Sequence, residues 1–368
     1  MPSRIGVAVA ITALTLLTPT AAAAAQDTNS SATASVSGPA AQPSAGQAGT
    51  QDGPTWPQLR ARVVGTLEED GVARAMNKHG DVPFRTEQGD PLVWNAATGK
   101  RRALEGAPNA NPTDIADDGR VVGVRAGQGV VLWNADGTLT TPGLPDGETA
   151  AGMARLGEDG TLLVTASHQF IGWPGGHPRV ATSYYRWRPE SGYKRLAGPG
   201  DGSYTSAIND EGLVVGWRSD TGTAWRPDGT EATYAGSVPG TTRTWLHGVN
   251  DSGVAVGGEI RPDGTAAAIR WDAPNTPRRL TDEGLGGEAL DINERGWITG
   301  TVRATAGGGS LPVVWDPHGG THRLDRMLEL PEGSSVQSID ALNDHNQLLL
   351  RIRDAASRRT TAMVVQLV

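Results

Sequence analysis

Aromatic, histidine and arginine side chains concentrate in one long segment, Ser167–Tyr185, of a chain that has only 2 Phe and 5 Tyr among its 368 residues. Rings with an apolar face and a polar edge, set beside Arg and His, are typical of surfaces that bind a carbohydrate or a peptide. Two shorter segments further along the chain add similar groups. The candidate ligand-binding residues are His168, Phe170, Trp173, His177, Tyr184, Tyr204, Arg243, Trp245 and His247. Alternatively, Phe170 and Trp173 only pack their segment against the rest of the domain.

Charged residues on the expected innermost strands of the fold are the candidates for acid–base chemistry or ion binding. They are Asp114, Asp291 and Asp340, with Arg74 and Arg155 at related positions. The favoured alternative is that they form ion pairs between neighbouring structural units. His168 and His177 are nine residues apart, which is not the ligand spacing of a helix or strand. The sequence therefore assigns no catalytic residue, no metal and no cofactor.

Seven copies of one turn must position these groups. They read MNKHGD (Met76–Asp81), IADDGR, LGEDGT, INDEGL (Ile208–Leu213), VNDSGV, INERGW and LNDHNQ, and they recur every 39 to 52 residues. Asn accepts backbone hydrogen bonds at such a turn, and Gly takes the left-handed position that a type I turn with a bulge requires. In the last copy Asn346 replaces Gly and can adopt the same conformation. The period is typical of propeller repeats.

Three strands follow each turn in a common pattern. The first often contains a glycine four residues past the turn glycine, which indicates close approach by another group. The second ends in tryptophan, and the third is weaker. The glycines are Gly123, Gly216, Gly257 and Gly300, and the tryptophans are Trp94, Trp133, Trp187, Trp225, Trp271 and Trp315. A tryptophan repeated in register indicates a core anchor, so each unit is predicted to be four antiparallel strands.

The two ends of the repeat region are complementary. The last unit lacks its fourth strand, whereas an unassigned strand, Leu59–Glu68, precedes the first turn. Pairing the two closes a ring and leaves no raw sheet edge. The predicted fold is all-β, a seven-bladed β-propeller of four-stranded antiparallel blades with the N-terminal strand closing the last blade. Eight blades is the nearest alternative, and an open two-domain β protein is less favoured.

The N-terminus has the layout of a secretory signal. Residues 1–25 place a basic residue before an apolar run and a small-residue tract, and that run is too short to span a bilayer. Residues 26–55 are rich in Ser, Ala, Gly and Pro, which predicts a disordered linker. The propeller is expected over residues 56–368. The protein is therefore expected to be secreted and extracellular, with no membrane span.

Composition limits the partners. The chain has no cysteine, so disulfides do not contribute to its stability and a thiol cannot take part in catalysis. The net charge is −8 without a basic block, which argues against nucleic acid as a partner. A monomer is expected. Three lysines among 32 basic residues indicate a GC-rich, actinobacterium-like source.

The pattern A-x-x-I-N-D-x-G-x-V-V-G, followed by a strand with an aromatic residue, resembles the secreted HAF-repeat family of bacterial extracellular proteins. Ser206–Trp225 matches best, and Leu246–Trp271 and Ala289–Trp315 match well. The eponymous His-Ala-Phe is replaced by TAW, IRW or VVW. The resemblance implies an extracellular, propeller-like repeat protein and supplies no catalytic residues.

These observations favour a non-catalytic binding or scaffold protein that recognises an extracellular polysaccharide or protein. The uniform turns mark one face as scaffold, so binding is expected on the opposite, loop-rich face. The alternative is a glycoside hydrolase or lyase that uses carboxylates at the central channel. Two carboxyl groups about 5–10 Å apart at the channel mouth would favour the hydrolase, and Asp–Arg pairs between blades would favour the scaffold.

Overall fold

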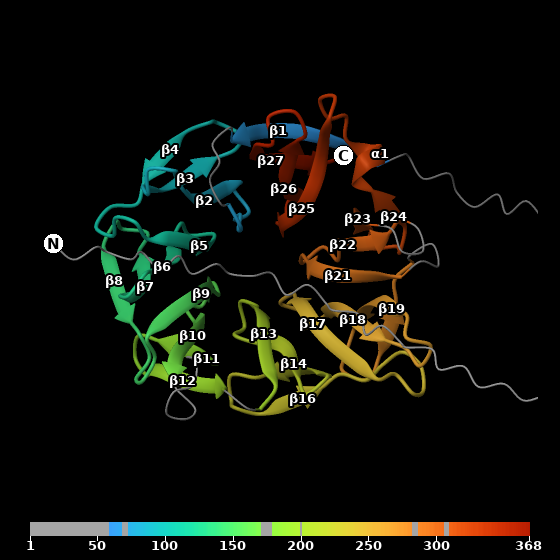
Figure 1. The fold of residues 1–368 in the computed structure, drawn as a ribbon, viewed down its shortest axis with the longest axis horizontal. Coiled ribbons are helices and arrows are strands. Elements are labelled where there is room, and N and C mark those ends of the chain that lie inside the picture. Colours follow the sequence, from blue (N-terminus) through green and yellow to red (C-terminus); the bar gives the residue numbers. More distant parts are fainter. Residues whose placement is uncertain (1–58, 68–72, 171–178, 199–200, 282–285, 305–308) are drawn as a thin grey trace, which may run out of the picture. The chain divides into compact units, whose positions relative to one another are not determined.

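The computed structural model describes residues 59–67, 73–170, 179–198, 201–281, 286–304 and 309–368. Within the unit Pro57–Val368 they form seven antiparallel sheets, arranged as the blades of a propeller (Figure 1). The predicted signal and linker, residues 1–25 and 26–55, lie outside the described residues. The predicted seven-bladed propeller is confirmed, and the eight-bladed and open alternatives are wrong.

In blades 2 to 6 the strands follow the chain order from the innermost strand outward. Blade 1 contains β2 (Asp81–Arg85), β3 (Pro91–Asn95) and β4 (Arg101–Ala103). Blade 2 contains β5 (Asn111–Ile115), β6 (Val121–Arg125), β7 (Gly129–Trp133) and β8 (Leu139–Gly143). Blade 3 contains β9 (Ala150–Leu156), β10 (Leu162–Phe170), β11 (Arg179–Arg188) and β12 (Gly192–Ala197). Blade 4 contains β13 (Ser203–Ile208), β14 (Val214–Arg218), β15 (Thr221–Trp225) and β16 (Glu231–Thr233).

Blades 5 and 6 follow the same order. Blade 5 contains β17 (Arg243–Val249), β18 (Ala255–Ile260), β19 (Ala266–Trp271) and β20 (Pro277–Arg279). Blade 6 contains β21 (Gly287–Ile292), β22 (Ile298–Arg303), β23 (Ser310–Trp315) and β24 (Thr321–Arg323), followed by the short helix α1 (Leu324–Met327). Blade 7 contains β25 (Ser334–Leu342), β26 (Gln347–Asp354), β27 (Thr360–Leu367) and β1 (Ala61–Leu67). In the described parts of the chain, no helix is long and apolar enough to cross a membrane.

Blade 7 closes the ring as predicted. β1 pairs antiparallel with β27, from Ala61 opposite Leu367 to Leu67 opposite Ala362. The closing strand is Ala61–Leu67 rather than the predicted Leu59–Glu68. Leu67 is 1% exposed, so this strand contributes to the core as well as covering an edge.

Blade 1 departs from the predicted four strands, because its described residues form a three-stranded sheet. The residues before its turn, Ala73, Ala75 and Met76, are buried but lie outside the strand ladder. They therefore fill the innermost place of the blade without strand pairing.

The repeated tryptophans are core anchors, as predicted. All six are at most 7% exposed. Three of them also donate their indole N–H to a carbonyl near the end of the preceding blade. These bonds are Trp133 Nε1 to Glu105 O at 2.8 Å, Trp271 Nε1 to Ala235 O at 2.7 Å and Trp315 Nε1 to Thr281 O at 2.7 Å. The anchors thus fix neighbouring blades to each other as well as filling the space between them.

The strand glycines allow a bulge in the innermost strand to approach them closely. A Cβ at Gly216 or Gly257 would overlap the backbone carbonyl of Tyr204 or Trp245. In both blades the pairing register shifts at this point, which is the mark of a β-bulge. The predicted close approach is confirmed, and the approaching group is the backbone itself.

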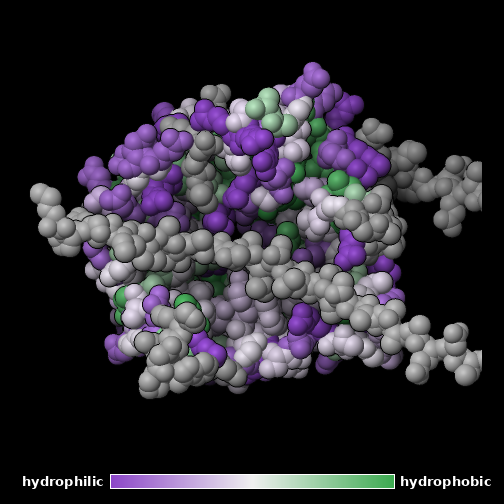
Figure 2. Space-filling model, viewed as in Figure 1, coloured by the Kyte–Doolittle hydropathy of each residue, from purple (hydrophilic) through white to green (hydrophobic). Residues whose placement is uncertain are grey.

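Apolar side chains are placed mainly inside and between the blades. Figure 2 shows hydrophilic side chains (purple) gathered over blades 1 and 7 at the top of the view, with hydrophobic residues (green) in small separate patches. Exposed large apolar residues are few in the described chain, and Phe170 and Tyr204 are two of them, at 42% and 46% exposed.

Candidate functional site

A row of aromatic rings runs from blade 3 to blade 5. Tyr184 meets Tyr204 edge-on, with ring centroids 5.8 Å apart. Tyr204 stacks on Trp217 at 4.3 Å and an interplanar angle of 18°, and Trp217 meets His247 edge-on at 6.0 Å. Tyr184 is buried and supports the row, whereas Tyr204 is exposed. Such stacked and edge-on pairs stabilise each other, so the row is ordered before any ligand arrives.

Glu288 of blade 6 ends this row. Its Oε1 accepts hydrogen bonds from Trp245 Nε1 at 2.6 Å and from His247 Nε2 at 2.7 Å. Burial raises the pKa of Glu288, but the hydrogen bonds from His247 and Trp245 and the charge of His247 outweigh it, so the pKa lies below its usual value. The group is therefore a carboxylate at neutral pH. We define the aromatic row as Tyr204, Trp217, Trp245, His247 and Glu288.

The innermost strands place the row at the end of the blades opposite the repeated turns. Tyr204, Trp245 and Glu288 lie near the starts of β13, β17 and β21, whereas the turns follow the ends of these strands. His247 is the extra residue of the bulge in β17, where the register shifts between Leu246 and Gly248. The bulge changes the direction of this side chain relative to a regular strand.

Gly258 supports the indole of Trp245. The two residues are paired across β17 and β18, and a Cβ at Gly258 would lie 2.5 Å from the indole ring. The indole can therefore lie over β18 only because residue 258 has no side chain. This packing directs the indole N–H toward Glu288.

The structure brings together four of the predicted ligand-binding residues, namely Tyr184, Tyr204, Trp245 and His247. Trp217 and Glu288 were not predicted. The sequence does carry a signal for Glu288, because Tyr204, Trp245 and Glu288 each lie five residues before the second residue of a repeated turn. Trp217 is a tryptophan outside the anchor register.

Arg243 was predicted with the row, but it is paired with Asp220. Its Nε donates to Asp220 Oδ1 at 2.6 Å. Both side chains are exposed on the loop face. The guanidinium of Arg243 is therefore already paired with a carboxylate at the edge of the aromatic row and is not free to bind a ligand.

His168 and Phe170 lie elsewhere, on the long β10–β11 hairpin of blade 3. Their rings contact each other at 6.0 Å, and His168 Nδ1 lies 3.2 Å from Glu148 Oε2. Tyr185 donates its hydroxyl to the other oxygen of Glu148 at 2.7 Å. This cluster fixes the base of the hairpin, and among the described aromatic residues of the hairpin only Tyr184 contacts the row. Trp173 and His177 lie outside the described residues.

The turn face is held together by the repeated asparagines. Each of five buried Asn side chains donates to the backbone carbonyl of the equivalent residue in the next blade. The bonds run from Asn77 to Ala116, Asn209 to Asn250, Asn250 to Asn293, Asn293 to Asn343 and Asn343 to Asn77, at 2.9 to 3.3 Å. The last bond joins blade 7 to blade 1. The turns are therefore structural, as predicted, and they lock the ring.

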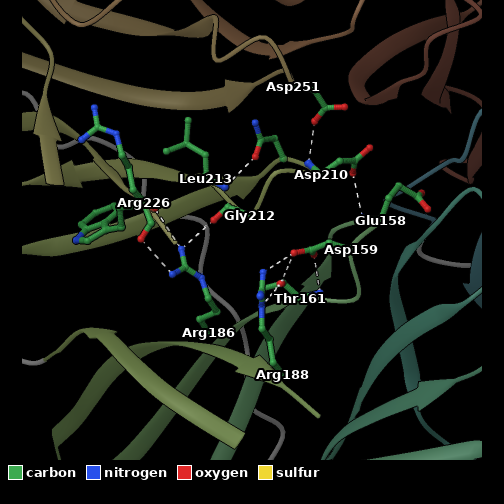
Figure 3. Close-up of polar contacts among 12 residues, drawn as sticks. Glu158, Asp159, Thr161, Arg186, Arg188, Asp210, Gly212, Leu213, Arg226 and Asp251 are labelled. Carbon is green, nitrogen blue, oxygen red and sulfur yellow. Dashed lines mark hydrogen bonds and ion pairs between the residues drawn. The ribbon is translucent and has the colours of Figure 1, made fainter. Parts of the chain in front are cut away.

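The next residue of each turn adds a second relay of hydrogen bonds, and Figure 3 shows its part from Glu158 through Asp210 to Asp251. Glu158 N donates to Asp210 Oδ1 at 3.0 Å, and Asp210 N donates to Asp251 Oδ1 at 2.8 Å. Asp251 N continues the relay to Glu294 Oε1 at 2.6 Å. These residues line a cavity of about 210 Å³ at the turn end of the channel. Sequence reasoning assigned the turns to scaffold and did not predict this cavity.

Three of the carboxyl groups at this cavity are harder to ionise than usual. Burial raises the pKa of Asp210, with further contributions from the negative charges of Asp251 and Glu158, to about 7. Burial likewise raises the pKa of Glu158 and of Glu294. Lys78 is the one cation at the equivalent turn position and forms an ion pair with Asp117 at 3.0 Å. In the described chain, no group of three or more His, Asp and Glu side chains is arranged to hold a metal ion.

The three acidic residues of the innermost strands accept hydrogen bonds or form ion pairs, whereas Arg155 Nε is buried without a hydrogen-bond partner among the described residues. Asp114 accepts hydrogen bonds from its neighbour Ile115 N and from Leu156 N of the next blade, both at 3.0 Å. Asp340 forms an ion pair with Arg351 at 2.7 Å within blade 7. Burial raises the pKa of Asp291 to about 6, partly opposed by the charge of Arg155. Asp114 joins neighbouring blades through a backbone hydrogen bond, and the Asp340–Arg351 pair lies within one blade, so these contacts among the described residues are not the predicted ion pairs between blades.

No protein-family model and no curated protein matches this chain. Solved structures do match. An oligogalacturonate lyase in complex with manganese is 13% identical, with a TM-score of 0.55 over 84% of this chain and 91% of that one. YCF48 from Cyanidioschyzon merolae is 11% identical, with a TM-score of 0.51 over 83% and 98%. A streptogramin B lyase is 12% identical, with a TM-score of 0.50 over 84% and 98%.

At these identities the likeness shows the fold alone. The chain is a repeat protein of the seven-bladed β-propeller class. This fold suits a binding or scaffold role and also hosts enzymes, so the function has to be argued from the site.

Proposed function

We propose that this chain is a secreted, non-catalytic binding protein of the HAF-repeat type that recognises an extracellular polysaccharide through the aromatic row. The single observation that carries the proposal is the stack of the exposed Tyr204 on the half-buried Trp217, set beside a carboxylate that two side-chain donors hold in place. Aromatic rings offer sugar rings an apolar face, and a fixed carboxylate accepts hydrogen bonds from hydroxyl groups.

A preorganised site supports binding. Glu288 is already bonded to Trp245 and His247, and Tyr204 is already stacked, so a ligand orders few side chains on arrival. Little conformational entropy is then lost on association. The row lies on the loop face. In proteins built on a rigid scaffold, binding residues are commonly found on such a face.

Catalysis by channel carboxylates finds less support. Asp114 accepts two backbone N–H groups, and Asp340 is held in an ion pair with Arg351. Carboxyl groups used in these ways serve the packing of the blades. We therefore retain binding as the function and propose no reaction.

Tyr204→Ala tests the proposal, with Tyr204→Phe and Phe170→Ala as controls. Glycans retained on an array would be measured again by calorimetry with each variant. Loss of an exposed stacking ring is expected to weaken binding about 30-fold, corresponding to about 2 kcal/mol. Tyr204→Phe keeps the ring and should bind within about threefold of wild type.

Phe170→Ala removes an exposed ring of similar size on the hairpin, outside the row. It is expected to leave affinity unchanged. If Phe170→Ala abolished binding and Tyr204→Ala did not, the hairpin would be the binding surface and the proposal would be wrong.

A further inference from the structure

We propose that Glu288 makes the aromatic row selective for glycans whose sugar units carry a protonated amine. This inference rests on the proposed function and names the ligand class of the same site. It draws on three features of the row: a free carboxylate oxygen, the aromatic rings around it, and the pairing of nearby arginines.

The first feature is that only one of the two carboxylate oxygens of Glu288 is hydrogen-bonded by the described residues. Oε1 accepts both side-chain hydrogen bonds, from Trp245 and from His247. Oε2 has no hydrogen-bond partner among the described residues, and the Glu288 side chain is 39% exposed. The carboxylate is thus held in one orientation with one oxygen available to a ligand. An ammonium group bonds to such an oxygen more strongly than a neutral hydroxyl does.

The second feature is the set of aromatic rings around this oxygen. The Trp245 indole lies over Gly258 with its N–H edge on the carboxylate, and the His247 ring, which also bonds to Glu288, meets the Trp217 indole edge-on. A cation near an indole is attracted by the electron-rich face of the ring. The same surroundings offer the apolar face of a sugar ring a place to pack. An amino sugar satisfies both interactions at once.

The third feature is the pairing of the arginines that could otherwise attract an acidic sugar. Arg218 donates to Ser203 Oγ at 3.0 Å and forms an ion pair with Glu231 at 2.6 Å. Arg243 is held by Asp220. Arg303 is exposed at the end of β22, two residues beyond Thr301, which pairs with Glu288. Of these three arginines, only Arg303 forms no ion pair with the described residues, so it is the arginine on which a carboxylated sugar is expected to bind.

The test compares three linear oligosaccharides of equal length by calorimetry: a glucosamine oligomer at a pH where it is protonated, its N-acetylated form, and an oligogalacturonate. Wild type is expected to bind the amine form at least about tenfold more tightly than the N-acetylated form. Added salt should reduce this preference, because the pair is partly exposed.

Glu288→Gln keeps an oxygen for Trp245 and His247 and removes the negative charge. It is expected to weaken binding of both oligomers and to abolish the preference for the amine form, because the negative charge that distinguishes the two forms is gone. Glu190→Gln, an exposed glutamate between β11 and β12, is the matched control and should retain the preference.

Equal binding of the amine and N-acetylated forms would overturn the inference and leave glycan binding intact. Tighter binding of the oligogalacturonate, lost in Arg303→Ala, would also overturn it. If no glycan bound but a lysine-rich peptide bound in a Glu288-dependent manner, the ligand would be a protein. Both the inference and the proposed polysaccharide function would then fail.

Discussion

At the scale of single residues, two carboxylates show how environment sets charge in opposite directions. Two side-chain donors hold Glu288, so its pKa is lowered and it stays ionised. Asp210 lies in a relay of like charges, and its pKa is raised to about 7. The first environment suits recognition of a cation. The second makes the stability of the propeller depend on pH through the ionisation of Asp210.

Asp210→Asn should make the propeller more stable at pH 8. The folded pKa of about 7 lies above the ordinary value of 3.8, so the folded state binds more protons than the unfolded state between these values. Stability is therefore expected to fall as pH rises from about 4 to about 7. Asparagine keeps an acceptor for Glu158 N and removes the charge.

Protein atoms desolvate part of the Asp210 carboxyl, but the residue is exposed at the rim of the cavity, so solvent screening limits the gain to about 0.5–1 kcal/mol. Urea unfolding at pH 5 and pH 8 measures the difference between variant and wild type. If the variant were less stable than wild type at pH 8, the negative charge of Asp210 would not be destabilising the folded state.

Gly258→Ala should impair the site without unfolding the blade. The new methyl group would meet the indole of Trp245 and displace it, breaking the N–H bond to Glu288. Glycan affinity is expected to fall about tenfold while the melting temperature changes by a few degrees. Calorimetry and thermal unfolding of the same preparation separate the two effects. Unchanged affinity would mean that the position of the indole does not matter.

At the scale of elements, the repeated turn performs two tasks with consecutive residues. The asparagine side chain bonds to the next blade, and the following residue passes a hydrogen bond along the ring. Two copies lack the asparagine, at Ala116 and Gly157. There, Asp118 and Asp159 bond to the backbone N–H groups of Arg120 and Thr161, the place that asparagine takes elsewhere.

Asn209→Ala should destabilise the propeller by about 2 kcal/mol, because it removes two bonds of a buried amide. The exposed Asn275→Ala is the matched control and should change stability by less than about 0.5 kcal/mol. Denaturant unfolding of both variants measures the cost. Equal stabilities would contradict the interblade role of the asparagines.

Elements of this kind were predictable from the sequence because their signals are local and repeated. Turn chemistry, strand glycines and anchor tryptophans recur in register, and together they predicted seven blades. Glu288 was missed because its role depends on Trp245, forty-three residues away. The pairing of Arg243 with Asp220 likewise depends on side-chain conformation, which no repeat pattern specifies.

At the scale of the whole molecule, the aromatic row can form only if the ring of blades is closed. The row draws on blades 4, 5 and 6, and its support comes from Tyr184 of blade 3. These blades keep their spacing only if the ring is complete. The bonds from β1 to β27 and from Asn343 to Asn77 complete it.

A chain that begins at residue 73 lacks β1 and should fail to fold cooperatively. It leaves the edge of β27 unpaired and removes the buried Leu67. Such an edge is prone to aggregation. A chain that begins at Pro57 retains β1 and should unfold in one transition. Thermal unfolding and size-exclusion chromatography compare the two, and a monomeric, cooperative product from the shorter chain would contradict the closing role of β1.

Hydrogen exchange of the propeller with and without the glucosamine oligomer tests the central claim most directly. If the aromatic row is the binding surface, added oligomer will slow exchange in peptides covering β13–β14, β17 and the start of β21. The β10–β11 hairpin and the repeated turns will exchange as before. Protection confined to the turn face or to the hairpin would contradict the claim.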